Sequence, residues 1–294
     1  MAGSKRKKMA KGDVVFNAVI YTFFALVLLV TLWPLINRLA YSFDERFDSL
    51  IGCLHLFPRK FVLRNYKDAL QITGVQRGLL TSFARTVMGT ATSLAANALL
   101  AFILSRKKFL FKRAFALFWI MTIYVQGGIV PTYILYSKLN LRENFWVYII
   151  PGMINALYML VIRTYMKGIP DSLEEAAQLE GAGYGRIFLT VVSPLCKPVY
   201  AAVGLFIATS QWNAWFDSML YNKFTPELTT IQYELYKMSQ KMKGVVNDAA
   251  GCSSYPPRRV KAAVSIVAML PLLIAYPFFQ KYFIAGLKVE GIKE

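Results

Sequence analysis

The chain has 294 residues, of which 56% are hydrophobic and 15% aromatic, and its formal net charge is +18. So many apolar residues exceed what the core of a soluble domain of this length can hold, which indicates an integral membrane protein. A strongly basic surface is also typical of nucleic-acid-binding proteins. We do not favour that class, because much of the excess charge lies in two short segments that membrane topology explains and no stacking aromatics accompany it.

Six stretches without a charged residue are long enough to cross a bilayer as helices, which takes roughly 20 apolar residues. They do not alternate between apolar and polar positions, as the strands of a membrane β-barrel would. We therefore predict an all-α membrane protein with six transmembrane helices. The charge-free stretches are Val14–Asn37, Thr86–Ser105, Ala114–Ser137, Asn144–Ile162, Pro198–Phe216 and Ala262–Gln280. The corresponding spans are placed at about 14–37, 80–105, 114–137, 144–162, 198–216 and 262–280.

Lysine and arginine concentrate in two places, which predicts the orientation of the spans. The N-terminal tail, residues 1–13, holds five cations, and the link SRKKFLFKRA between the second and third spans holds five more and no acid. Because short cytoplasmic loops retain Lys and Arg during insertion, both segments belong inside. We thus expect a transmembrane domain over 14–284, with the stretch Arg163–Lys197 and the C-terminal tail 285–294 also in the cytoplasm.

One of these cytoplasmic stretches, EEAAQLEGAGYGRIFLTVVSPLCKP from Glu174 to Pro198, is acidic and rich in glycine. Pro170 should end the preceding helix, Ser172 should cap the next one, and Glu175 three residues later would complete a capping box. Glu174 and Glu175 also lie where the positive end of a helix favours acids.

Small residues share one face of this predicted helix, at spacings of three and four, which would let another protein approach closely. The residues on that face are Leu173, Ala176, Ala177 and Gly181. Gly181, Gly183 and Gly185 would permit a sharp turn after the helix, and Pro194 and Pro198 would restart the chain toward the fifth span. From the residues alone, an amphipathic helix resting on the bilayer or on its own bundle is an equally good interpretation.

The sequence contains no motif for catalysis, a metal or a bound cofactor. There is no G-x-x-x-x-G-K-[ST] phosphate loop, and GAGYGR has Arg186 where a dinucleotide fingerprint needs glycine. His55 is the single histidine, and the three cysteines lack the paired spacing of metal ligands. Cys53 and Cys252 are both expected outside, as free thiols or less favourably as a disulfide, and Cys196 as a cytoplasmic thiol.

With EEAAQLEGAGYGRIFLTVVSP the segment resembles the coupling motif of ATP-binding-cassette (ABC) importer permeases. That motif reads E-A-A, three residues, G, nine residues, I, one residue, L-P. Val191 replaces the isoleucine conservatively, and Ser193 stands where the family has leucine. The residues that match it are Glu175, Ala176, Ala177, Gly181 and Pro194.

Further stretches from about Phe61 to the C-terminus, among them GGIVPTYILYSKLNL, QWNAWFDSMLYN and YPFFQKYFIAGLKVEGIKE, resemble carbohydrate importer permeases of the maltose type. They resemble in particular the second permease subunit of the branch that imports oligosaccharides often containing uronic acids, such as alginate.

The resemblance implies a type I ABC importer permease fold in which residues 170–194 form a cytoplasmic coupling helix. That helix would dock into a cleft of a separate ATPase, with Glu175 pairing with a cation, Ala176 and Ala177 seating the helix, and Gly181 making the bend. The tail Gly286–Glu294 could also reach the ATPase. The chain itself would be neither an enzyme nor a cofactor-binding protein, since ATP and Mg²⁺ would bind to the ATPase.

The implied assembly lies in the bacterial inner membrane with both termini of this chain in the cytoplasm. It contains a second permease subunit in a heterodimer, two ATPase subunits, and an extracytoplasmic solute-binding protein that meets the outer loops. In the long outer loop, residues 220–260, LTTIQYELYKMSQKMK places Ile231, Leu235 and Met238 at helical spacing with lysines opposite. We expect an amphipathic helix there, either meeting the solute-binding protein or resting on the membrane.

Polar and aromatic residues in the spans are candidates for the sugar pathway, because polar groups inside a bundle often mark a route. Each has an ordinary alternative as an interfacial anchor or a packing hydrogen bond. Gly127, Gly128 and Pro131 would permit a broken helix beside that route, and Asp217 is expected to be a structural or gating residue. The candidates are Gln126, Tyr133, Tyr136, Asn155, Gln211, Trp212, Asn213 and Trp215.

Two other classes remain open from the residues alone. An ion-driven secondary transporter would need ionisable groups inside the spans, and the six stretches contain none, although backbone carbonyls could hold sodium. A membrane assembly subunit would need no polar pathway residues at all.

Overall fold

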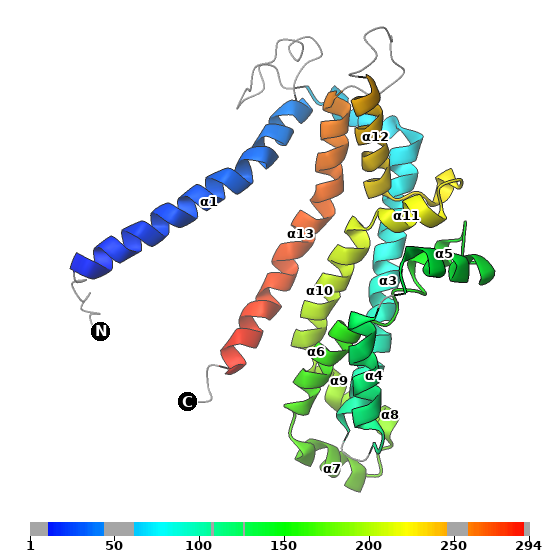
Figure 1. Ribbon diagram of the computed structural model, residues 1–294. Coiled ribbons are helices and arrows are strands. Elements are labelled where there is room, and N and C mark those ends of the chain that lie inside the picture. The colour runs from blue at the N-terminus through cyan, green and yellow to red at the C-terminus, as the bar shows by residue number, and fades with distance from the viewer. Residues whose placement is uncertain (1–10, 44–61, 107–108, 126, 246–257, 291–294) are drawn as a thin grey trace. The chain divides into compact units, whose positions relative to one another are not determined.

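The computed structural model describes residues 11–43, 62–106, 109–125, 127–245 and 258–290, and within these ranges the regular structure is entirely helical (Figure 1). The chain forms two compact units, which are described separately: Met1–Ala69 with Tyr255–Ile266, and Leu70–Ser254 with Val267–Glu294. The predictions made for Gln126, Cys53, Cys252 and His55 fall outside the described residues.

The first unit contains α1 (Lys11–Phe43) and most of α2 (Arg64–Gln71). The two helices are joined by polar contacts where α1 ends. The Ser42 and Tyr66 hydroxyl groups lie 2.7 Å apart, and Asn65 Nδ2 donates to the Ser42 carbonyl at 3.0 Å. The side chains along the apolar part of α1 are exposed within the chain, which suits a helix that contacts lipid.

The second unit is organised around α3 (Thr73–Ser105). This helix packs along α10 (Lys197–Asn213) and α6 (Ala156–Lys167), and α12 (Ile231–Val245) lies beside its N-terminal part (Figure 1). Small residues make this packing possible, since interfaces between membrane helices favour side chains that let backbones approach. The buried core beside α3 includes Ala98, Ala101, Phe102, Met159, Ile162, Met166, Val203 and Ile207.

Within the described ranges, three helices are long and apolar enough to cross a membrane: Val15–Phe43, Thr73–Ser105 and Arg259–Phe278. Two pairs of shorter helices would raise the number to five if each bent pair were one span. The count of six spans therefore remains a prediction. The last of the three belongs to α13 (Arg258–Glu290), which continues as a helix through residue 290 into the expected tail.

The stretch expected as the third span is a broken helix, as the glycines suggested. It consists of α4 (Lys112–Tyr124) and α5 (Ile129–Lys138), bent by 114°. Gly128 precedes α5 with φ of 82°, a conformation that side chains other than glycine rarely adopt.

The stretch 144–162 does not form one continuous helix. It begins with a short 3₁₀ helix, η2 (Phe145–Tyr148), and resumes as α6 after Pro151 and Gly152, which do not favour helix interiors. The remaining elements are short: α7 (Asp171–Leu179), α8 (Tyr184–Arg186), the π-helical segment η3 (Ile187–Val192), α9 (Ser193–Leu195), α11 (Phe216–Tyr221) and η4 (Pro226–Leu228).

Candidate functional site

The helix predicted for coupling is α7, and it begins earlier than expected. Its N-cap is Pro170, with φ of −59°, and no side chain caps its first turn. Ser172 therefore lies inside the helix, and the predicted capping box with Glu175 is wrong. Proline explains the difference, because Pro170 has an extended backbone with ψ of 133°, which suits the residue that directly precedes a helix.

The predicted bend after α7 lies at Gly181. Its φ is 80°, whereas neither Gly183 nor Gly185 has a positive φ. The Gly181 amide donates to the Gln178 carbonyl and the Ala182 amide to the Ala177 carbonyl, both at 3.0 Å. These are the two hydrogen bonds of a Schellman motif, which ends a helix with a left-handed residue.

The two sides of α7 face different surroundings, which divides the residues that the sequence grouped on one face. Ala177 is buried in the core beside α3, and Glu174 forms an ion pair with Arg106 at the end of α3. Glu175 and Ala176 are exposed, as is Leu179, whose exposed fraction is 91%. The outward side therefore presents the Glu175 carboxylate next to Ala176 and Leu179, whereas Ala177 packs against its own subunit.

After the bend, the chain returns to α10 through α8, η3 and α9. Ile187 and Val192 are buried there, and Pro194 is exposed in α9. The run Tyr184–Leu195 meets α10 at 82°, so the two form a bent pair. Cys196 at this corner is a buried free thiol.

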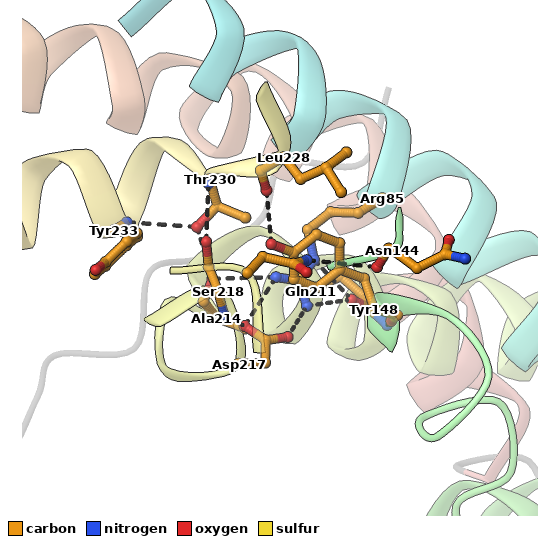
Figure 2. A network of polar contacts seen from close by, with 11 residues as sticks. Arg85, Asn144, Tyr148, Gln211, Ala214, Asp217, Ser218, Leu228, Thr230 and Tyr233 are labelled. Carbon is orange, nitrogen blue, oxygen red and sulfur yellow. Dashed lines mark hydrogen bonds and ion pairs between the residues drawn. The ribbon is translucent and has the colours of Figure 1, made fainter. Parts of the chain in front are cut away.

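A second group of polar residues surrounds Arg85, a residue of α3 that is 2% exposed (Figure 2). All five N–H groups of its guanidinium donate to acceptors. Nε and Nη2 donate to Gln211 Oε1 at 3.2 and 2.9 Å, and Nη1 and Nη2 donate to the Asp217 carboxylate at 3.1 and 2.6 Å. Nη1 also donates to the Ala214 carbonyl at 3.3 Å. Arg85 thus ties α3 to the end of α10 and the start of α11.

Gln211 and Asp217 are both held in this network. Gln211 Nε2 also donates to the Tyr148 carbonyl at 3.4 Å, and the Arg85 guanidinium lies 4.4 Å from the centre of the Tyr148 ring. The Tyr148 hydroxyl donates to the Leu228 carbonyl at 2.6 Å (Figure 2). The sequence reasoning missed Arg85, because it lies directly before the charge-free stretch that begins at Thr86. The sequence did contain a signal: Arg85 lies directly before one charge-free stretch, and Asp217 lies directly after another, Pro198–Phe216.

Asn213 and Trp215 line an open groove between α10 and α13, with a volume of about 1040 Å³. The wall is mostly apolar, with Asn213, Ser210 and Thr209 as the neutral polar residues of α10. The Trp215 ring stacks on Tyr236 of α12 at 4.3 Å between centroids. The other lining residues are Leu205, Phe206, Ala214, Phe216, Asp217, Leu272, Leu273 and Tyr276.

The remaining pathway candidates lie elsewhere in the second unit. Trp212 is buried, and its Nε1 donates to the Ala268 carbonyl of α13 at 2.8 Å. Asn155 caps α6 by accepting from the amides of Leu157 and Tyr158. Of the described candidates, Asn213 and Trp215 therefore line the groove, whereas Trp212 and Asn155 make contacts elsewhere in the fold.

Tyr133 and Tyr136 of α5 pack against Tyr221 of α11, at 6.0 and 5.3 Å between ring centroids. The Arg142 guanidinium lies 4.9 Å from the centre of the Tyr133 ring. The contact with Tyr221 could not be predicted from the sequence, because Tyr221 lies in a short helix far along the chain from α5. The rings are used to hold α5 against α11.

The predicted amphipathic helix of the long loop is α12, and it packs on α3. Ile231 and Met238 are buried, so the apolar side of this helix faces α3 of the same chain, and the Ile231 amide donates to Ser82 Oγ at 2.9 Å. A Cβ at Gly78 would lie 3.1 Å from the Ile231 backbone, so the contact depends on glycine. Burial raises the pKa of the neighbouring Tyr233 above its ordinary value.

Related proteins match this chain, in sequence and in structure, over almost its whole length. No protein-family model matches the sequence. The chain is 30% identical over 280 residues to the polygalacturonan/rhamnogalacturonan transport system permease protein YtcP of Bacillus subtilis (strain 168), covering 95% of this chain and 98% of that protein.

Two solved structures share the fold. A chain of a bacterial ABC transporter involved in the import of the acidic polysaccharide alginate superposes with a TM-score of 0.83 at 27% identity, covering 94% of this chain and 99% of that one. A chain of a bacterial alginate ABC transporter, in complex with an alginate pentasaccharide-bound periplasmic protein, gives 0.59 at 15% identity, covering 92% and 93%. The helical fold, the matched length and the permease relative together show that this chain belongs to the permease subunits of ABC sugar transport systems.

Proposed function

We propose that this chain is one half of a heterodimeric permease that imports an oligosaccharide containing uronic acids across the bacterial inner membrane. Support comes from the names of its relatives, since polygalacturonan and alginate are both acidic polysaccharides. An ion-driven carrier is not favoured, because the related proteins are ABC transport permeases.

The observation that carries the coupling part of the proposal is the outward side of α7. Glu175 and Ala176 are exposed next to Leu179, a leucine that is 91% exposed. A carboxylate beside small and apolar side chains suits docking to a cationic, partly apolar cleft. Two separate ATPase subunits would supply that cleft and bind ATP and Mg²⁺, and this chain would bind no cofactor. Both termini of this chain would then lie in the cytoplasm with α7.

The groove between α10 and α13 is the best candidate for this chain's share of the sugar route. It combines the amide of Asn213, the hydroxyl groups of Ser210 and Thr209, and the rings of Trp215 and Tyr276. Amide and hydroxyl groups next to aromatic faces suit the mixed polar and apolar surface of a sugar. The second permease would close the open side, and an extracytoplasmic solute-binding protein would deliver the sugar near α12.

Charge reversal at Glu175 tests the docking role. In membranes that also contain the partner subunits, Glu175→Lys should reduce co-purification of the ATPase and uncouple ATP hydrolysis from transport, because a like charge would then face the cationic cleft. Glu180→Lys is the matched control, since Glu180 is exposed directly after α7. Normal docking and coupling in Glu175→Lys would refute the proposal.

A substitution in the groove tests the sugar route. Asn213→Ala should lower transport while leaving ATPase docking intact, because it removes an amide that can bind a sugar hydroxyl. Gln211→Ala is not a clean test, because it also removes an acceptor of Arg85. Transport equal to that of the unsubstituted protein in Asn213→Ala would remove this groove from the route.

A further inference from the structure

Where α3 ends, the cation at its C-cap meets an acid in the first turn of α7. Arg106 is the C-cap of α3, and Nη1 of its guanidinium donates to a carboxylate oxygen of Glu174. The two side chains are 14% and 17% exposed, so the ion pair is largely shielded from water. Both charges also suit their helices, since a cation stabilises a helix C-terminus and an acid stabilises an N-terminus.

Neighbouring groups hold both partners of this ion pair in place. Nε and Nη2 of Arg106 donate to Ser105 Oγ at 3.1 and 2.9 Å, and the guanidinium lies 4.7 Å from the centre of the Phe102 ring. Gln178 Nε2 donates to the other carboxylate oxygen of Glu174 at 3.2 Å. An ion pair supported in this way has lost the side-chain freedom that makes exposed pairs weak.

A second attachment lies beside the ion pair and is apolar. Phe102 of α3 packs against Phe188 of η3 at 5.1 Å between ring centroids, and Ala177 is buried in the same core. Phe188 ties η3 to α3, and Ala177 holds α7 in the same core. The Arg106–Glu174 ion pair adds a contact with a preferred geometry and so further limits how α7 can rotate.

We infer that the Arg106–Glu174 ion pair fixes the orientation of α7 on α3 and so points Glu175 and Leu179 outward. Arg106 is then a positioning residue for energy coupling. When the ATPase pushes on the outward side of α7, the ion pair prevents α7 from rotating, so the movement is transmitted to α3. The inference rests on the proposed docking role of α7. It assigns to Glu174 a function different from that of its neighbour Glu175, because Glu174 is paired with Arg106 whereas the Glu175 side chain is exposed.

The first experiment measures sugar transported per ATP hydrolysed in the complete importer, reconstituted in liposomes. Glu174→Gln and Arg106→Gln should each assemble with the ATPase and hydrolyse ATP, but the transport ratio should fall roughly tenfold or more, because small misplacements of a positioned group have effects of that size. The double exchange Arg106→Glu with Glu174→Arg should recover part of that loss. Glu180→Gln is the matched control.

Two results would overturn the inference. One is a transport ratio in both single variants equal to that of Glu180→Gln. The other is a double exchange no better than the worse single variant, which would indicate general damage to α7. The docking proposal fails separately: if Glu175→Lys remains coupled, α7 does not dock, whereas an uncoupled Glu175→Lys with a normal Glu174→Gln refutes the ion-pair role alone.

A second measurement does not depend on activity. Spin labels at Ile103 on α3 and Leu173 on α7, both exposed and neither among the proposed docking residues Glu175, Ala176 and Leu179, report the distance between the two helices by pulsed electron resonance. The labels are placed in the complete importer with the native cysteines of this chain replaced by serine. The distance distribution should be narrow in the parent and broader in Glu174→Gln. Equal widths would refute the positioning role even if transport changed.

Discussion

Removal of the Asp217 carboxylate is the sharpest test of the Arg85 network. In Asp217→Ala, two of the five hydrogen bonds of a guanidinium that is nearly inaccessible to water lose their acceptor. Breaking a buried ion pair from one side costs about 3–5 kcal/mol. The Asp217 side chain is 26% exposed, so water can replace part of what is lost, and we expect about 2–3 kcal/mol.

This cost can be measured as a change in the apparent melting temperature of the purified protein in detergent. A loss of that size corresponds to a decrease of roughly 4–10 °C. Arg85→Met should cost less, because it leaves a carboxylate that water already reaches. The double variant should be at least as stable as Asp217→Ala, because it contains no unpaired buried cation.

The control for this series is Glu227→Ala, which removes an exposed acid from η4 close to the same helices. Its melting temperature should change by less than that of Asp217→Ala. If Asp217→Ala is as stable as Glu227→Ala, or if the double variant loses the sum of the two single effects, the hydrogen bonds of Arg85 do not stabilise this region.

Three further substitutions test single contacts. Gly181→Ala should weaken ATPase co-purification by roughly fivefold, because a φ of 80° costs residues other than glycine about 1 kcal/mol. Gly183→Ala should leave co-purification unchanged, because Gly183 has no positive φ. Equal binding of the two variants would contradict the role of the bend. Gly89→Ala should lower the melting temperature, since its Cβ would lie 2.8 Å from Gln211 Nε2, and should be nearly neutral when Gln211 is already alanine. Trp212→Phe keeps an aromatic ring but removes the hydrogen bond to α13, and should cost about 1 kcal/mol in thermal unfolding; no change would show that the bond is dispensable.

Local features of the chain could be predicted from the sequence because their causes are local. The break before α5 follows from two adjacent glycines, and the end of α7 follows from a glycine that can adopt a positive φ. The buried side of α12 follows from the spacing of Ile231 and Met238. The predicted cap at Ser172 failed for an equally local reason, since Pro170 competes for the start of the same helix and begins it earlier.

The contacts that build the candidate sites could not be predicted in the same way, because they join distant parts of the chain. Arg85 meets Gln211 and Asp217 at sequence separations of 126 and 132, and Arg106 meets Glu174 at 68. Composition and spacing carry no information about which cation forms an ion pair with which acid. For this reason the sequence places Gln211 and Asn213 together as pathway candidates. In the structure Gln211 accepts hydrogen bonds from Arg85, whereas Asn213 lines the groove.

Both missed ion pairs involve the residues that frame the charge-free stretch Thr86–Ser105. A helix of that length is roughly 30 Å long, about the thickness of the hydrocarbon core, so Arg85 and Arg106 would lie near its two boundaries. A search for charge-free stretches excludes both arginines by definition, and these two side chains tie α3 to its neighbours. Since all five donors of Arg85 are used and Arg106 is held by Ser105 and Phe102, tilting α3 alone would break buried ion pairs at either end. We therefore expect α3, α7 and α11 to move together during transport. Spin labels on α3 and α7 should then keep the same separation in ATP-bound and nucleotide-free importers, and a change in that separation would refute the rigid connection.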